Sequence, residues 1–151
     1  MPTWQDFADA APELAAYAFE RLNKRLAYLA TLRADGGPRV HPVSPFVANG
    51  RLFIYMEPLS PKARDLLRDE RYALHCAVED AEGGGGELSL AGSARLVPDP
   101  DERAMVFAAA RSTGQSPKER YVIFDFDVER VIATTYPGDQ TLRRRWPERG
   151  A

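Results

Sequence analysis

Residues 27–56 read AYLATLRADGGPRVHPVSPFVANGRLFIYM and contain two strong turn signals. The segment 28–33 has a strand-like pattern, and the run Ala-Asp-Gly-Gly-Pro that follows it is typical of a hairpin. Asn49-Gly50 is a two-residue hairpin turn that leads into the apolar segment 52–56. The stretch therefore predicts three consecutive antiparallel strands that form a meander.

The middle strand of this stretch, predicted over 39–48, carries Pro42 and Pro45. Proline has no backbone N–H to donate to a neighbouring strand, so we expect this strand to be an edge, to be bulged, or to be exposed along one side. Its unpaired backbone groups could instead contact the edge of a planar heteroaromatic ring.

Helical patterns surround this stretch on both sides. Thr3 and Trp4 open a short helix, and Pro12 begins a second one whose apolar residues recur at helical spacing. We expect this N-terminal helical extension, about residues 3–25, to lie against a sheet. Downstream, Ser60 is a predicted N-cap with Pro61 at the first helical position. The residues predicted for its buried face are Ala63, Leu66 and Leu67.

The rest of the chain repeats the strand pattern. Strands are predicted over 72–78, 87–97, 121–128 and 131–136, with a helix from Asp99 to about Arg111 and a basic, strand-like tail over 142–146. Six or seven strands at hairpin spacing with short helices between them predict an α+β domain built on a mainly antiparallel β-barrel.

Composition limits the classes of function. A length of 151 residues, 44% of them hydrophobic, suits a single domain over 1–151. The net charge of −2 favours neither nucleic acid nor a membrane surface as a partner. The lone Cys76 excludes an intramolecular disulfide framework and any multi-cysteine zinc site, and acidic residues interrupt any N-terminal export signal. A cytoplasmic location is the expectation.

The start of the helix at Ser60 is a candidate anion site. The first N–H groups of a helix lack internal partners and carry the positive end of its dipole. Lys62 in the first turn is unfavourable there unless an anion compensates it, and Arg64 follows closely. A phosphate would supply that anion. Taken alone, however, the segment is more often a solvated lysine behind an ordinary cap.

Arg39 and His41 lie on the proline-containing strand and offer a second set of polar groups. Arg39 could neutralise a phosphate, and His41 could donate to a ring carbonyl. By itself, His41 is more often a surface histidine on an edge strand.

The order of these elements resembles that of the pyridoxamine 5′-phosphate oxidase-like family of flavin-binding split barrels. The resemblance covers roughly residues 27–111, with weaker similarity toward the end of the chain. The implied fold is a split β-barrel. The matching segments are Tyr28 to Arg33, Asp35-Gly36-Gly37, Arg39-Val40-His41-Pro42-Val43, Leu52 to Met56, Ser60-Pro61-Lys62-Ala63-Arg64-Asp65-Leu66, Tyr72-Ala73-Leu74-His75 and Leu90 to Val97.

In that family the cofactor is usually FMN, held in a groove at a homodimer interface. The resemblance implies that Ser60 and Lys62 bind the phosphate and that Arg39 approaches it. It also implies a set of residues beside the isoalloxazine ring. These are Val40, His41, Pro42 and Val43, and Tyr55 and Met56 fall where the third strand approaches the cofactor.

Two departures argue against oxidation of vitamin B6. The oxidases proper carry a substrate-gripping Arg-x-His pair near the C-terminus, whereas this chain has Arg143-Arg144-Arg145-Trp146 and no histidine there. Ser44 also stands where those oxidases have a lysine. The resemblance therefore leaves the substrate open and names no catalytic residue.

Other candidate residues are more typical of structural roles. Cys76 is expected to be a buried structural thiol, and Asp125 and Asp127 are expected to face solvent rather than to form a catalytic dyad. Two histidines are too few for a zinc site, so no metal is predicted. The run 143–145 is typical of a solvated tail, although it could bind a phosphate, and Trp146 could stack on a ligand or pack at a dimer interface.

These observations favour a homodimeric FMN-dependent oxidoreductase that acts on an unknown small organic substrate, in which the protein supplies orientation and a phosphate anchor. Two alternatives stay open. One is a reductase that uses the deazaflavin coenzyme F-420 in a similar groove. The other is a non-catalytic flavin-binding or stress-response protein. A haem-binding relative is less expected.

Overall fold

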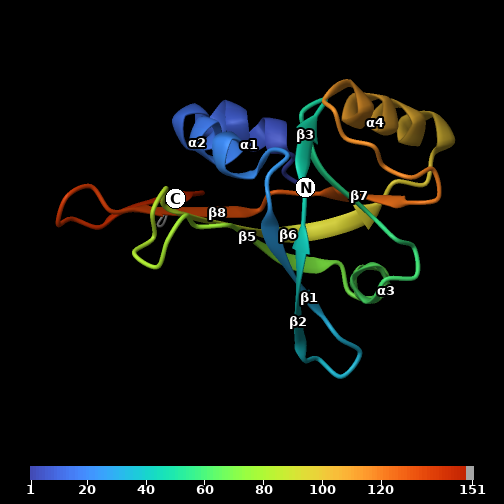
Figure 1. Ribbon diagram of the computed structural model, residues 1–151, viewed down its shortest axis with the longest axis horizontal. Coiled ribbons are helices and arrows are strands. Elements are labelled where there is room, and N and C mark those ends of the chain that lie inside the picture. Colours follow the sequence, from blue (N-terminus) through green and yellow to red (C-terminus); the bar gives the residue numbers. More distant parts are fainter. Residues whose placement is uncertain (149–151) are drawn as a thin grey trace.

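The computed structural model describes residues 1–148, which form four helices and nine strands (Figure 1). The last three residues of the predicted domain, 149–151, lie outside the described part. The helices are α1 (Trp4–Ala10), α2 (Pro12–Leu22), α3 (Pro61–Arg68) and α4 (Pro100–Ser112). The strands are β1 (Ala27–Leu32), β2 (Pro38–Val43), β3 (Phe46–Ala48), β4 (Arg51–Met56), β5 (Arg71–Cys76), β6 (Glu87–Leu96), β7 (Val122–Phe126), β8 (Arg130–Thr135) and β9 (Leu142–Trp146).

The strands form one curled antiparallel sheet in the order β2-β1-β5-β6-β7-β4-β3, with β8 beside β6 and β9 beside β8. The long strand β6 joins the two halves: residues 87–91 pair with β8, and residues 94–96 pair with β7. Along the described chain the end strands β2 and β3 do not pair with each other, so the barrel stays open. The predicted α+β split barrel is therefore confirmed.

Gly92 lies where β6 passes from one neighbour to the other. A Cβ atom at this position would clash with the Asp127 carbonyl oxygen, so only glycine lets the β7–β8 corner approach this closely. The corner is held by backbone hydrogen bonds from Asp127 N to Ser93 O (2.9 Å) and from Glu129 N to Ala91 O (3.0 Å). The curl of the sheet depends on this contact.

The predicted strand over 39–48 is divided in the structure. It becomes β2, which pairs only with β1, and β3, which pairs with β4, so the predicted meander is wrong. The break falls at Ser44 and Pro45, where the Pro45 carbonyl accepts a hydrogen bond from Lys24 N (2.7 Å). Because Pro45 cannot donate to a ladder, the chain leaves one half of the sheet there and enters the other. The expectation that the proline-containing strand is an edge is confirmed for β2.

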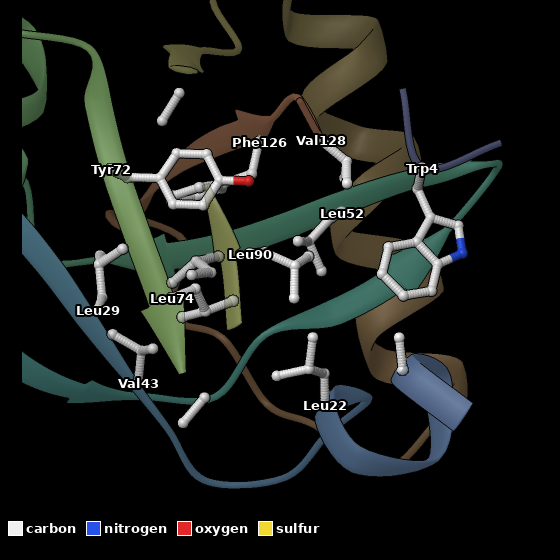
Figure 2. Packing of buried hydrophobic residues seen from close by; sticks show 14 of the residues in the cluster. Trp4, Leu22, Leu29, Val43, Leu52, Tyr72, Leu74, Leu90, Phe126 and Val128 are labelled. Atoms are coloured by element: carbon white, nitrogen blue, oxygen red, sulfur yellow. The ribbon is translucent and has the colours of Figure 1, made fainter. Parts of the chain in front are cut away.

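Helices α1 and α2 pack on the inner face of the sheet, as predicted. Thr3 and Asp6 form a capping box at the start of α1, which directs Trp4 and Phe7 into the core. Figure 2 shows Trp4 and Leu22 pointing toward side chains from the strands. The other labelled core residues are Leu29, Val43, Leu52, Tyr72, Leu74, Leu90, Phe126 and Val128.

A second apolar cluster lies between α4 and the sheet. It joins Phe46 and Phe53 of the β3–β4 hairpin to Val106 and Phe107 of α4. The hairpin turn has the positive φ angles of a type I′ turn, 52° at Asn49 and 72° at Gly50, as the sequence predicts. The strand β4 thus separates the two clusters, because its alternate side chains point to opposite sides.

Candidate functional site

Helix α3 starts as the sequence predicts. The Ser60 hydroxyl accepts a hydrogen bond from Ala63 N (3.4 Å) and donates one to the Glu57 carbonyl (2.7 Å), and Pro61 occupies the first helical position. Ala63 and Leu66 are buried, as expected. The prediction that Leu67 is also buried is wrong, because Leu67 is 62% exposed. The rotation of α3 buries Asp65 instead.

Asp65 is 1% exposed and is surrounded by hydrogen-bond donors. Its Oδ2 accepts a bond from the Thr31 hydroxyl (2.7 Å) and another from Arg39 Nε (2.7 Å). Its Oδ1 lies 3.2 Å from Arg68 Nη2. Burial disfavours the charged form, but the bonds from Thr31 and Arg39 outweigh it and lower the pKa of Asp65 below its ordinary value. The buried group is therefore a carboxylate.

A pocket of about 390 Å³ opens beside this carboxylate, between the β1–β2 hairpin and α3. Arg39 and Arg64 both line it, so the structure brings together two of the three cations that the sequence grouped. The remaining lining residues are Arg33, Ala34, Asp35, Pro61, Asp65 and Arg68. Four arginines face two aspartates, so the pocket keeps a net positive charge.

Lys62 lies on a neighbouring side of α3, close to His41. Burial lowers the pKa of Lys62, with the nearby Glu57 carboxylate opposing the change. Among residues 1–148, Lys62 forms no ion pair within 4.0 Å. The third predicted cation is thus partly withdrawn from water without a close counter-charge, an arrangement that favours binding of an anion.

His41 lies near enough to Lys62 and Arg39 for both charges to act on its imidazole. Burial lowers the pKa of its imidazole, and the charges of Lys62 and Arg39 lower it further. Its Nε2 is buried and has no hydrogen-bond partner within the described chain. An unsatisfied buried ring nitrogen that feels two positive charges suits a ligand that brings an acceptor or a negative charge.

The other residues predicted near the isoalloxazine ring lie in three different parts of the structure. Val40 and Pro42 lie on the opposite face of β2 from Arg39 and His41, and both are exposed. Val43 and Met56 point into the main core. Tyr55 stacks on Tyr121, with ring centroids 5.8 Å apart, beside the α4 cluster.

The remaining sequence candidates take structural positions. Cys76 is buried, as expected. The prediction that Asp127 faces solvent is wrong, because it is 3% exposed and ion-paired with Arg95, and Asp125 is paired with Arg51. The Asp125 pair joins β7 to β4, and the Asp127 pair joins the corner after β7 to β6.

The basic tail forms the edge strand β9. The Arg144 guanidinium lies 5.2 Å from the centroid of the Tyr17 ring. Trp146 packs on Phe7, with ring centroids 5.2 Å apart. Trp146 therefore extends the main core of the same subunit, a role that the sequence did not suggest.

Asp65 and Thr31 are the residues that sequence reasoning missed. Asp65 lies within the motif that begins at Ser60, but an acidic residue in a helix is ordinarily exposed. The helical pattern gave no signal for its burial, because residues two positions apart in a helix, such as Ala63 and Asp65, do not share a face.

Two classes of site find no support in residues 1–148. No group of three or more histidine, cysteine and acidic side chains there is arranged to hold a metal ion. No helix in this part of the chain is both long enough and apolar enough to cross a membrane. The arrangement that remains is a set of cations around the start of α3 and the edge strand β2.

Solved structures of low sequence identity share this fold. A conserved hypothetical protein, Rv2991 from Mycobacterium tuberculosis, is 23% identical over 80% of this chain and 82% of its own, with a TM-score of 0.64. A heme binding protein from Mycobacterium smegmatis is 21% identical over 85% of this chain and 55% of its own, with a TM-score of 0.63. An F420 reductase is 20% identical over 74% and 91% of the two chains, with a TM-score of 0.56.

The sequence also matches a family model. No curated protein matches the chain. The model described as pyridoxamine 5′-phosphate oxidase matches residues 15–135, which include every strand from β1 to β8 and the whole cationic site. The chain therefore belongs to the pyridoxamine 5′-phosphate oxidase-like family of split barrels, as its sequence predicts.

Proposed function

We propose that this protein binds FMN through its 5′-phosphate and carries out two-electron oxidation–reduction on a small organic substrate. The observation that carries the proposal is Lys62, a partly buried cation with no close counter-charge in the described chain, beside the unsatisfied Nε2 of His41. Family membership adds support, because flavin is the common cofactor of these split barrels.

In this proposal Lys62 and Arg39 bind the phosphate, and the first turn of α3 after Ser60 contributes the positive end of its dipole. His41 donates from Nε2 to the ligand, which satisfies a nitrogen that is otherwise unpaired. The isoalloxazine of bound FMN supplies the hydride chemistry, and the chain supplies binding and orientation. Neither Val43 nor Met56 turns its side chain to the ligand, since both lie in the core.

A second copy of the chain is the proposed partner. Val40 is 63% exposed and Tyr28 is 43% exposed on the outer face of the sheet, separated by small side chains such as Ala30. This face includes the strand β2, which carries Arg39 and His41 on its other side. A second subunit that covers it would therefore reach the rim of the cofactor site. Light scattering should give a dimer mass, and Val40→Asp should shift the protein toward the monomer.

A comparison of FMN with riboflavin tests the cofactor assignment. Flavin fluorescence should show that FMN binds at least about tenfold more tightly, because riboflavin lacks the phosphate that contacts Lys62 and Arg39. Equal affinity for the two flavins would overturn the phosphate assignment.

The absorption spectrum of purified protein separates the alternatives. Two flavin bands support FMN, whereas a colourless protein that binds added coenzyme F-420, another phosphate-bearing ligand, points to a deazaflavin reductase. An intense haem band in place of both would contradict the proposal. The rate at which bound, reduced FMN is reoxidised separates an enzyme from a carrier. If an organic acceptor reoxidises it no faster than oxygen does, the protein is a flavin carrier.

A further inference from the structure

Arg39 is held in an unusual way for a residue that is meant to bind a ligand. Its Nε donates to the buried Asp65 carboxylate at 2.7 Å, while no hydrogen bond within the described chain engages its two Nη groups. The arginine side chain is 28% exposed, so the Nη groups remain within reach of a ligand. One edge of the guanidinium is thus fixed and the other is free.

The Asp65 carboxylate is itself fixed. The Thr31 hydroxyl, on a buried residue of β1, donates to the same Oδ2 that accepts from Arg39. Thr31 and Arg39 are direct cross-strand partners in the β1–β2 ladder, so the sheet register sets the spacing of the two donors that meet the Asp65 carboxylate. Arg68 approaches the other oxygen, Oδ1, from the next turn of α3.

Electrostatics explain why an acid is needed at this point. Arg33, Arg64 and Arg68 line the same pocket as Arg39, and Lys62 lies on the neighbouring side of α3. Like charges repel, and a long arginine side chain can reduce that repulsion by turning toward solvent. A buried, ionised carboxylate that binds Nε opposes this movement.

We propose that Asp65 is a positioning residue that holds Arg39 in place for the phosphate of the ligand. The inference rests on the proposed function, because it assigns a role within the same phosphate site. The consequence runs against simple charge counting: replacing Asp65 with a neutral side chain makes the site more positive, and yet it should weaken phosphate binding.

The test compares FMN with riboflavin in matched variants. Asp65→Asn should lower the affinity for FMN about tenfold and change the affinity for riboflavin by no more than about twofold. Only FMN has the phosphate that the Arg39 Nη groups bind. Glu70→Gln makes the same change of charge at an exposed position two residues after α3 and should leave both affinities unchanged. A general loss of structure would lower both affinities together.

A second pair of variants tests the coupling directly. Arg39→Lys keeps the positive charge, but an ammonium group lacks the planar arrangement in which Nε binds Asp65 while the Nη groups face the phosphate, so FMN affinity should fall. Adding Asp65→Asn to this variant should then cause little further loss, because interacting residues are not additive. Full additivity of the two losses would overturn the inference.

Each outcome has a separate meaning. If the unmodified protein does not prefer FMN to riboflavin, the proposed function fails. If that preference holds and Asp65→Asn binds FMN as tightly as Glu70→Gln does, or more tightly, only the role of Asp65 fails. Should Asp65→Asn not fold, Thr31→Val provides the test: it removes one bond to the carboxylate and should reduce the preference for FMN, and an unchanged preference overturns the inference.

Discussion

Arg21 and Lys62 are two cations partly or wholly withdrawn from solvent, and their surroundings differ. Arg21, in α2, is 6% exposed and donates from Nη2 to the Ala77 carbonyl (2.6 Å) and the Gly86 carbonyl (3.4 Å). It also lies 3.5 Å from a Glu79 carboxylate oxygen. Lys62 forms no ion pair within residues 1–148, and its neighbour His41 adds an unsatisfied nitrogen.

The difference separates a structural cation from one that is available to a ligand. The bonds of Arg21 secure the glycine-rich loop 83–86 to α2, so its charge contributes to the fold. The charge of Lys62 has no such partner, so binding of an anion is the means by which its burial is compensated. Burial alone would not distinguish the two residues, whereas the partners do.

Arg21→Met should produce the largest effect and should act on stability alone. Methionine keeps much of the apolar stem but leaves the Ala77 and Gly86 carbonyls without their donor, which should lower the free energy of unfolding by about 3 kcal/mol. Urea denaturation measures this loss. The exposed Arg25→Met is the matched control and should cost far less. If Arg21→Met also reduced the preference for FMN over riboflavin, Arg21 would not be a purely structural cation, and the contrast with Lys62 would fail.

Lys62→Gln should show the opposite pattern. Loss of a charge-assisted contact to phosphate should weaken FMN binding by about 2 kcal/mol, or about thirtyfold, with riboflavin binding unchanged. The free energy of unfolding should stay within about 0.5 kcal/mol, because no ion pair of the described chain is removed. Fluorescence titration and urea denaturation measure the two quantities. A large loss of stability would show that Lys62 is a structural cation like Arg21.

Ser60→Ala should have a smaller effect on both quantities. The hydroxyl caps α3 by accepting from Ala63 N, so its loss should cost about 1 kcal/mol of unfolding free energy. FMN binding should weaken less than in Lys62→Gln, because the hydroxyl already donates to the Glu57 carbonyl. Thr3→Ala removes the equivalent cap of α1 and should lower stability similarly without changing FMN binding. If both variants reduced FMN binding equally, Ser60 would have no direct role.

The pH dependence of stability should give the smallest effect. Burial and the nearby cations hold the pKa of His41 below 6.5, so the unfolded chain takes up a proton at higher pH than the folded chain does. The free energy of unfolding should therefore fall as the pH falls below about 6.5. Denaturation at several pH values measures this slope, and His41→Gln should flatten it. Added inorganic phosphate should reduce the loss in the unmodified protein, since a bound anion favours the protonated ring.

Local sequence patterns predicted most of the elements. Turn residues such as Asn49-Gly50 and caps such as Ser60 act within a few positions of themselves, so their effect is visible in the sequence. The division of 39–48 into β2 and β3 was not predicted, because the loss of a donor at Pro45 shows that a ladder ends but not where the chain continues.

The candidate site was predicted in part. Lys62 and Arg64 were predicted from the start of the helix at Ser60 and Arg39 from the proline-containing strand, and Arg39 and Arg64 do line one pocket. Val43 and Met56 were assigned to the cofactor from the family resemblance, and their side chains lie in the main core, where Val43 shares the face of β2 that carries Arg39 and His41. The burial of Asp65 and Asp127 depends on contacts with distant strands and is absent from any local pattern.

The sequence by itself determined the elements, the family and the cations at the start of α3, since caps, turns and motif order are properties of neighbouring residues. The tertiary structure alone decided which of the charges are satisfied. Arg21 meets its carbonyl partners across more than fifty residues, and Asp65 meets Arg39 only because α3 packs against β1, the strand that pairs with β2. Electrostatic energy depends on distance and on burial, and both are set by the packing of segments that are far apart in the chain.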